Sequence, residues 1–249
     1  MTLTKKLMTI GAVAGLLLVA GVASALHSPE HYSLFGDASY ITPGNASGRA
    51  VNIASDPTFG GINFPVEAGV TFASLTTLSS DFRVEADDTC VGGSPRVQIK
   101  VQTPSSGVKN IFAYFGTDSA GLPCIPGTWQ NSGDFLEVGR LLDTSQVGGT
   151  FYDPYVTALA NYGSYPVLSI QIVTDSSWAS LDAEHAADID NTLINSTLFT
   201  YEIPVAANKD QCKNGGWQNL ADDEGNSFKN QGDCVSFVAT QGKNKGSGS

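Results

Sequence analysis

The sequence predicts an all-β protein: an antiparallel β-sandwich with one short helix and a small disulfide-linked motif near its C-terminal end. Three observations lead to this fold class. Short runs are rich in Val, Thr, Ile and Phe, apolar and polar residues alternate within them, and turn residues separate them every ten or so positions. An alternating α/β chain would instead show helical periods between its strands.

Residues 82–103 carry the clearest alternation. Apolar side chains alternate with polar ones over 82–86 and again over 96–103, with turn residues and Cys90 between the two runs. We expect these runs to pair as antiparallel neighbours at the centre of the sandwich. Their wet face carries Arg83, Glu85, Gln98, Lys100 and Gln102. These side chains either pair across the strands or form the floor of a binding groove.

Further strands are expected on both sides of this stretch. They cover residues 49–54, 70–77, 110–115, 167–174, 189–194 and 198–203, with one or two short strands over 135–142. The last two long runs should form a closing hairpin. One helix is predicted, with Asp153 as N-cap, Pro154 in the first turn and Gly163 at its end.

The domain boundaries follow from composition. Residues 1–25 have the form of a signal peptide, with Lys5 and Lys6 before an apolar run and Ala23-Ser24-Ala25 as a cleavage site. The sandwich is expected over 26–204, a linker over 205–208, a small motif over 209–240 and a disordered tail over 241–249. A membrane anchor is the competing interpretation of the first segment.

Four cysteines in an exported protein predict two disulfides. Four cysteines allow three pairings, and their distribution favours Cys90 with Cys124 in the sandwich and Cys212 with Cys234 in the small motif. A zinc site is disfavoured, because no Cys-x-x-Cys spacing occurs.

The charge is strongly acidic and unevenly placed. Beyond residue 25 there are 11 Lys or Arg against 24 Asp or Glu, and the whole excess lies in residues 26–204. Such a surface repels nucleic acid and anionic lipid, because phosphate binding needs clustered Lys and Arg. We therefore expect a secreted, extracellular monomer with no nucleic-acid partner and no membrane span after signal removal.

Two resemblances extend these expectations. The segments 209–217 (KDQCKNGGW) and 228–238 (FKNQGDCVSFV) resemble a short C-terminal motif of exported bacterial proteins, a motif without an assigned function. The large domain is similar to galactose-binding-like jelly rolls, which include many carbohydrate-binding modules, at Ile189-Asp190-Asn191 and at residues 199–202. This second resemblance implies a jelly-roll-like sandwich, glycan binding through exposed aromatic residues, and a structural calcium held by loop oxygens.

Candidate site residues are of two kinds. The predicted ligand-binding residues are aromatic: Trp129, Tyr155, Tyr162 and Trp178. Sugar faces stack on such rings, although the same rings also serve to close the ends of a sandwich. The predicted calcium ligands are carboxylates: Asp182, Asp188 and Asp190. No other cofactor is expected, and no catalytic residue is assigned.

The sequence favours a binding protein over an enzyme. It contains no Gly-x-Ser-x-Gly elbow, no His-Glu-x-x-His motif and no Gly-rich phosphate loop. We expect a secreted, non-catalytic protein that binds glycans or another cell-surface polymer. The alternatives are a secreted carbohydrate-active enzyme, in which two carboxylates would face each other across a cleft, and a structural or adhesive surface protein.

Overall fold

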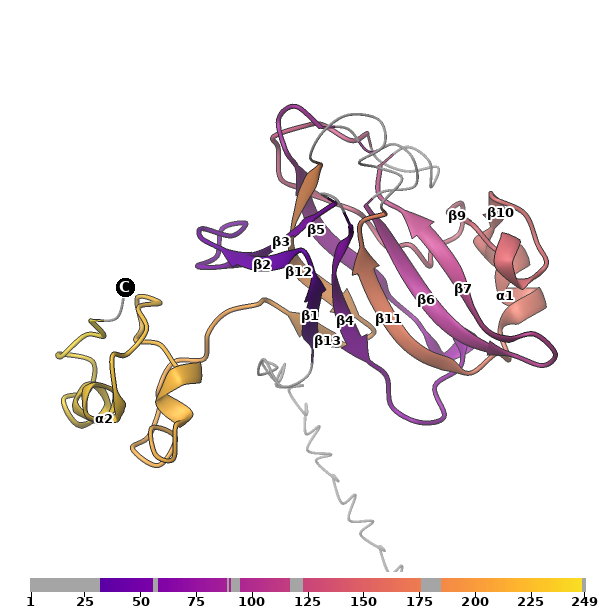
Figure 1. Ribbon diagram of the computed structural model, residues 1–249. Helices are drawn as coiled ribbons and strands as arrows, with labels where there is room; N and C mark the ends of the chain where they lie inside the picture. Colours follow the sequence, from indigo (N-terminus) through magenta and orange to yellow (C-terminus); the bar gives the residue numbers. More distant parts are fainter. Residues whose placement is uncertain are drawn as a thin grey trace, which may run out of the picture.

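The computed structural model describes residues 32–55, 58–88, 90, 95–116, 123–175 and 185–247. Two antiparallel sheets pack face to face, and a small C-terminal unit follows them in the chain (Figure 1). The predicted all-β sandwich is confirmed. The predicted signal peptide lies outside the described residues, and no helix within those residues is long and apolar enough to cross a membrane.

The first sheet has five strands in the order β1-β4-β11-β6-β7, and every neighbouring pair is antiparallel. Its strands are β1 (Ser33–Gly36), β4 (Gly60–Pro65), β6 (Arg96–Thr103), β7 (Gly107–Tyr114) and β11 (Val167–Val173). Of the neighbouring strands in this sheet, β6 and β7 are the one pair joined by a tight turn. The other neighbours come from distant parts of the sequence.

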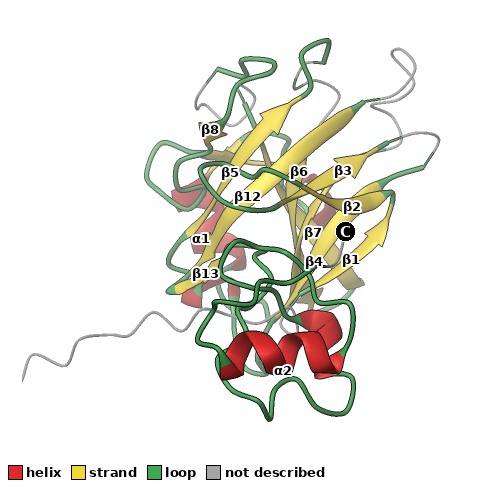
Figure 2. Cartoon of the chain, turned by 90° about the vertical axis from the view of Figure 1, so that its left-hand side faces the viewer, coloured by secondary structure: helices red, strands yellow, loops and turns green. Residues whose placement is uncertain are grey.

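The second sheet has the order β2-β3-β12-β5-β8, with β13 also paired to β12. Its strands are β2 (Ala38–Ile41), β3 (Ala50–Ala54), β5 (Leu78–Val84), β8 (Gln130–Asn131), β12 (Ala186–Ile194) and β13 (Thr197–Phe199). A separate short pair joins β9 (Leu141–Leu142) to β10 (Asp153–Pro154). Figure 2 shows the layers of the sandwich from the side.

The predicted pairing of residues 82–86 with 96–103 is wrong. Strand β5 pairs with β12 and β8, whereas β6 pairs with β11 and β7 in the opposite sheet. Alternation fixes which face of a strand is buried, but it does not identify the neighbouring strand. The predicted closing hairpin is confirmed, because β12 and β13 pair with Thr192 opposite Phe199.

The core lies between the two sheets and is built from their inward faces. Aromatic rings join the layers: Phe82 of β5 lies 4.9 Å from Phe115, which lies 5.2 Å from Phe135, measured between ring centroids. The largest fully buried side chains are Tyr201, Phe64, Phe72, Phe82, Phe115, Phe135, Ile53, Ile62, Leu78, Ile99 and Ile111. Their burial is the main favourable term for the sandwich.

Helix α1 (Tyr155–Tyr162) confirms the single predicted helix, but it begins one residue later than predicted. Asp153 is not the N-cap, because Asp153 and Pro154 form strand β10 and Pro154 precedes the first helical turn. The Asp153 carboxylate instead accepts hydrogen bonds from Thr144 and Thr150, which hold its pKa below the usual value. Short 3-10 turns occur at η2 (Phe72–Ser74) and η4 (Ser145–Val147).

Both predicted disulfides are confirmed. Cys90 is bonded to Cys124, which ties the connection between β5 and β6 to the loop before β8. Cys212 is bonded to Cys234 inside the C-terminal unit, which contains η5 (Gly216–Asn219) and helix α2 (Gln231–Ala239). Helix α2 was not predicted from the sequence, although Asn230 is a good N-cap residue.

Candidate functional site

The outer face of the five-stranded sheet carries the polar half of the strand alternation. In β6, Val97, Ile99 and Val101 are buried in the core, so Arg96, Gln98 and Lys100 lie on the opposite face. Directly paired residues of antiparallel strands share a face. The registers therefore identify the residues that accompany these three on the outer face.

Three amides form a row across the middle of this face. Gln171 of β11 is paired with Asn63 of β4 on one side and with Gln98 of β6 on the other. Gln98 Nε2 donates to Gln171 Oε1 at 2.9 Å, and Gln171 Nε2 donates to Asn63 Oδ1 at 3.1 Å. An amide group has two N–H donors and an oxygen with two lone pairs, so each member retains hydrogen-bonding capacity.

Two phenylalanine rings lie at the β1 side of the same face. Phe35 and Phe59 pack edge to face with centroids 6.1 Å apart, and Phe59 is 47% exposed. Gly61, which is paired with Phe35, makes room for this ring: a Cβ on Gly61 would lie 2.4 Å from Phe35 Cζ. The absence of a side chain at Gly61 thus lets an aromatic ring lie close to the sheet.

Charged groups lie toward the β7 side. Arg96 forms an ion pair with Asp175 at 2.5 Å, and its guanidinium carbon lies 4.7 Å from the centroid of the Phe112 ring. Lys100 is half-buried and follows Gln98 on the same face of β6. Within the part of the chain that the structure describes, no carboxylate forms an ion pair with Lys100.

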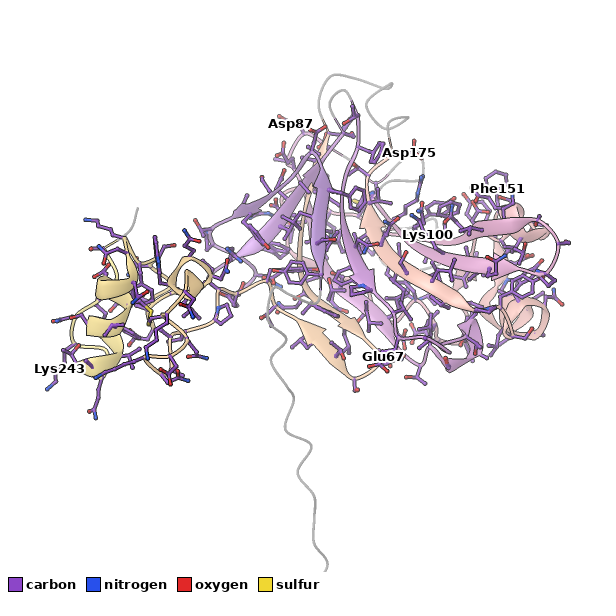
Figure 3. All side chains as sticks on the ribbon, turned by 60° about the horizontal axis from the view of Figure 1, so that its bottom comes forward. Glu67, Asp87, Lys100, Phe151, Asp175 and Lys243 are labelled. Atoms are coloured by element: carbon purple, nitrogen blue, oxygen red, sulfur yellow. A yellow bond between two sulfur atoms is a disulfide. The ribbon has the colours of Figure 1, made fainter. Side chains whose placement is uncertain are left out.

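These groups line a cavity of about 420 Å³ that we call the outer groove. Its lining residues are Phe35, Phe59, Arg96, Gln98, Lys100, Gln171, Val173, Thr174 and Asp175. Figure 3 labels Lys100 and Asp175, which come from β6 and from the residues just after β11. An exposed aromatic ring, neutral amides and one cation without an ion-pair partner among the described residues are the groups that recognise a polar ligand with apolar patches.

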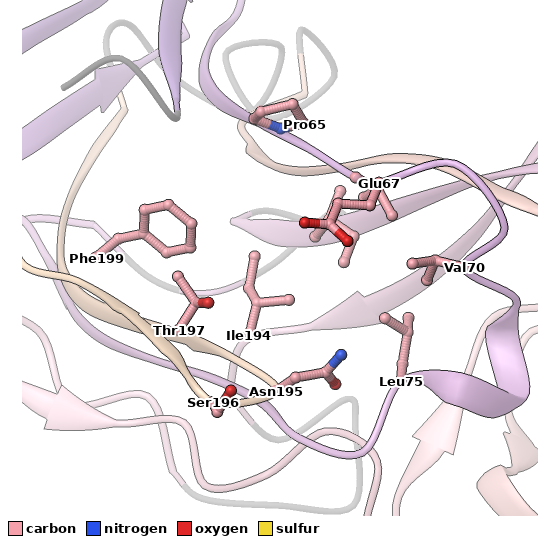
Figure 4. A pocket seen from close by; sticks show the side chains of 11 residues that line it. Pro65, Glu67, Val70, Leu75, Ile194, Asn195, Ser196, Thr197 and Phe199 are labelled. Atoms are coloured by element: carbon pink, nitrogen blue, oxygen red, sulfur yellow. The ribbon is translucent and has the colours of Figure 1, made fainter. Parts of the chain in front are cut away.

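A second cavity, also about 420 Å³, opens at one end of the sandwich near the turn between β12 and β13 (Figure 4). Its floor includes the buried core residues Leu75, Ile170 and Phe199. Glu67 lies at its rim across from Phe199, and Asn195 is already bonded to the backbone N–H of Thr76 at 2.7 Å. This cavity is more apolar than the outer groove and has no comparable row of polar side chains.

The predicted aromatic residues do not converge on one surface. Trp129 is half-buried, with the Arg83 guanidinium carbon 4.9 Å from its ring centroid over the outer face of the second sheet. On helix α1, Tyr155 packs against Phe72 of η2, and Tyr162 is buried in the core. Trp178 lies outside the described residues. A ligand-binding role for these four residues stays a prediction.

The predicted calcium ligands that the structure describes already accept hydrogen bonds from the protein. Asp188 pairs with Arg83 at 2.6 Å and accepts from Asn52 Nδ2 at 2.8 Å. Asp190 is fully buried and accepts from Ser47 Oγ at 2.5 Å and from the backbone N–H groups of Asn45 and Asn191. Burial nevertheless raises the pKa of Asp190.

Calcium binding stays a prediction. Asp182 lies outside the described residues. Among the residues that the structure does describe, no group of three or more His, Cys, Asp or Glu could hold a metal ion. Calcium needs six to eight oxygens in one place. The donors that surround Asp188 and Asp190 point hydrogen atoms at the oxygens that a cation would require.

His185, which lies in the acidic stretch near the predicted calcium ligands, is buried. Its Nδ1 contacts the Asp88 carboxylate, and the other oxygen of Asp88 accepts from the backbone N–H of Ala186 at 2.8 Å. Both members of the pair are less than 9% exposed. The pair therefore holds the start of β12 against the end of β5 and is remote from open solvent.

Several residues of the outer groove were not predicted as site residues. The sequence correctly places Gln98 and Lys100 on a solvated face. Phe35 and Phe59 of the groove, and Asn63 of the adjoining amide row, carry no local signal that relates them to β6. Phe35 lies in β1, Phe59 immediately precedes β4 and Asn63 lies in β4, so all three come to this face through the pairing of β1 and β4 in the same sheet. The outward alternation of Gln171 in β11 was the one further signal available.

Comparison with known proteins finds similar solved structures but no matching family. No protein-family model matches the sequence, and no curated protein matches it. Among solved structures, the chain is similar to an agarase with a TM-score of 0.37 and 11% identity, over 75% of this chain and 27% of the agarase. It is also similar to an exo-β-agarase, with a TM-score of 0.35 and 15% identity over 74% of this chain and 26% of that one.

A third similar structure is the xyloglucanase domain of a type three effector from Sinorhizobium fredii. The TM-score is 0.33 with 16% identity, over 68% of this chain and 95% of that domain. For the two agarases, by contrast, the present chain spans about a quarter of their length.

Proposed function

We propose that this is an exported, non-catalytic glycan-binding protein whose binding site is the outer groove. The observation that carries the proposal is the amide row of Asn63, Gln171 and Gln98 beside an exposed aromatic ring. Amides fixed by one another present donors and acceptors in set directions, which suits vicinal hydroxyl groups. The exposed ring of Phe59 supplies an apolar surface for the C–H face of a sugar.

The composition of the groove supports binding over hydrolysis. Glycoside hydrolysis uses two carboxyl groups that flank the scissile bond. Of the groove residues that the structure describes, Asp175 alone carries a carboxylate, and Arg96 holds it in an ion pair. The two disulfides fit the proposed export, since such bonds persist in oxidising compartments.

The outer face of the second sheet is a poorer binding surface than the outer face of the first sheet. Asp81 accepts hydrogen bonds from the side-chain amides of Asn45, Asn131 and Asn191. Asp188 is likewise engaged by Arg83 and Asn52. Polar groups that satisfy one another leave little capacity for a ligand, whereas the amide row of the outer groove retains unused donors and acceptors.

The test is binding of polysaccharides by affinity electrophoresis, followed by calorimetry on the best ligand. Replacing Gln98 and Gln171 together by Ala should weaken binding about tenfold or more, because at least two hydrogen bonds are lost. Gln102→Ala is the matched control, since Gln102 is exposed on the same strand outside the groove. Its affinity should equal that of the unmodified protein.

Two results contradict the proposal. If the unmodified protein binds no polysaccharide, the amides serve only to satisfy one another and the protein is a structural or adhesive one. If binding survives the Gln98 and Gln171 substitutions but is lost on Glu67→Gln, the ligand instead occupies the second cavity, near the turn between β12 and β13.

A further inference from the structure

The basic residues of the sandwich are few, so the position of each is informative. Residues 26–204 contain six Lys or Arg against 19 Asp or Glu. Three of the six form ion pairs: Arg83 with Asp188, Arg96 with Asp175, and Arg140 with Glu137. The charge of each is therefore already balanced within the protein.

The remaining three have no carboxylate partner in the described ranges. Arg49 Nε donates to the carbonyl oxygen of Tyr201 at 2.7 Å, and its guanidinium carbon lies 3.6 Å from the Tyr40 ring centroid. Lys109 is paired with the inward-facing Val101, on the opposite side of the sheet from the groove. Lys100 alone lines the outer groove.

The local charge of the groove is positive in an otherwise acidic domain. Its charged lining residues are Arg96, Asp175 and Lys100, and the first two neutralise each other at 2.5 Å. Lys100 lies two residues beyond Gln98 on the same face, about 7 Å along the strand. An anionic substituent on a sugar held by the amide row would thus be within reach of its ammonium group.

Long-range repulsion from the acidic surface does not outweigh an ion pair between Lys100 and an anionic group of the ligand. The Debye length is about 8 Å at physiological ionic strength, so distant carboxylates are largely screened, while a half-buried contact is screened much less. Polyphosphates are a poor fit because binding them takes many clustered cations, whereas this groove offers one uncompensated Lys.

We propose that the groove selects glycans that carry acidic groups, with Lys100 as the residue that binds the anion. This inference rests on the proposed glycan-binding function and names the substrate class. The acidic group is a carboxylate, as in a uronic acid, or a sulfate ester. Both present oxygen acceptors to the ammonium group, and the amide row binds the neighbouring hydroxyls.

The test compares polygalacturonate, its methyl-esterified form and a sulfated galactan by calorimetry with the full chain. The unmodified protein should bind at least one acidic polymer about fivefold more tightly than the ester, and this preference should shrink at high salt. Lys100→Met keeps the apolar stem and should remove the preference while retaining the weaker binding of the ester. Lys109→Met is the matched control and should change neither.

The outcomes separate the two proposals. A preference for carboxylate over sulfate, or the reverse, identifies the acidic group. Equal affinity for the acidic polymers and the ester, or a preference that Lys100→Met leaves intact, overturns the role of Lys100 while glycan binding stands. Failure to bind any neutral or acidic polysaccharide overturns both.

Discussion

At the scale of single residues, Asp190 shows how a buried carboxylate is accommodated. Three donors contact its oxygens: Ser47 Oγ and the backbone N–H groups of Asn45 and Asn191. Burial raises its pKa more than these donors lower it, and the nearby Glu202 raises it further. The stability that Asp190 contributes is therefore fully present below the ordinary carboxyl pKa and declines as the pH rises through the raised value.

Ser47→Ala should destabilise the sandwich in a pH-dependent way. At a pH above the raised pKa of Asp190, the ionised carboxylate loses a charged hydrogen bond, with an expected loss of about 1.5–3 kcal/mol. In acid, where Asp190 is protonated, the loss should fall to about 0.5–1.5 kcal/mol. Urea unfolding followed by tryptophan fluorescence at both pH values measures the difference.

Ser39→Ala is the control for this change. Ser39 is an exposed residue of β2 and, in the described ranges, its hydroxyl forms no hydrogen bond, so its replacement should alter stability by less than about 0.5 kcal/mol. An equal loss at both pH values for Ser47→Ala would show that Asp190 does not change its charge in this range.

At the scale of elements, helix α2 depends on its first turn. The Asn230 side chain accepts a hydrogen bond from the backbone N–H of Asp233 at 3.0 Å, and Asp233 in turn accepts from the backbone N–H of Lys229 at 3.1 Å. A carboxylate in the first turn also interacts favourably with the helix dipole. These contacts begin a nine-residue helix that is too short to be stable alone.

Asn230→Ala should destabilise the C-terminal unit by about 1 kcal/mol, because an N-cap acceptor is lost. Asn230→Asp retains the acceptor and should stay within a few tenths of a kcal/mol of the unmodified protein. Amide hydrogen exchange across residues 231–239 reports both effects. Equal exchange rates in the Ala and Asp variants would exclude a capping role for Asn230.

Local sequence patterns predicted where strands occur better than they predicted which strands pair with one another. The period-two runs of β5 and β6 correctly identified two strands and their buried faces, because burial is written into each strand. Their assignment to one hairpin failed, because the partners of each strand come from β11, β12 and other distant segments. Helix α2 was missed because its short apolar face, with Cys234 and Phe237 buried, is hidden in a polar, Gly- and Asn-rich segment.

The candidate site was predicted in part for the same reason. Gln98 and Lys100 could be placed on a solvated face from β6 alone. Asn63 and Phe59 could not be related to them, since the register that brings β4 beside β11 is a property of the whole sheet. Of the aromatic residues predicted as ligand contacts, Tyr162 on α1 packs into the core and Trp129 has the Arg83 guanidinium over its ring.

At the scale of the whole molecule, the chain has two separate apolar cores. The first fills the sandwich, and the second consists of Ala206, Cys212, Leu220, Phe228, Cys234 and Phe237. So small a set of side chains gives little burial energy, which makes the second core dependent on its disulfide. The Cys212–Cys234 bond spans 22 residues and should contribute about 3 kcal/mol by loop closure.

Replacing Cys212 and Cys234 together by Ser should unfold the C-terminal unit and leave the sandwich intact. Calorimetry should then show the main transition at an unchanged temperature, with hydrogen exchange protection lost only beyond residue 205. The matched variant, Cys90 and Cys124 to Ser, should have the reverse effect and lower the main transition. A single shifted transition for the first variant would mean that the two cores unfold together.

The amide row also gives the outer groove a direction. Both of its hydrogen bonds run the same way, from Gln98 to Gln171 and from Gln171 to Asn63. The Gln98 oxygen is thus the acceptor left at one end of the row, and the Asn63 amino group is the donor left at the other. A polymer with two chemically different ends would meet different partners in its two orientations, so the sheet itself distinguishes a chain from its reverse.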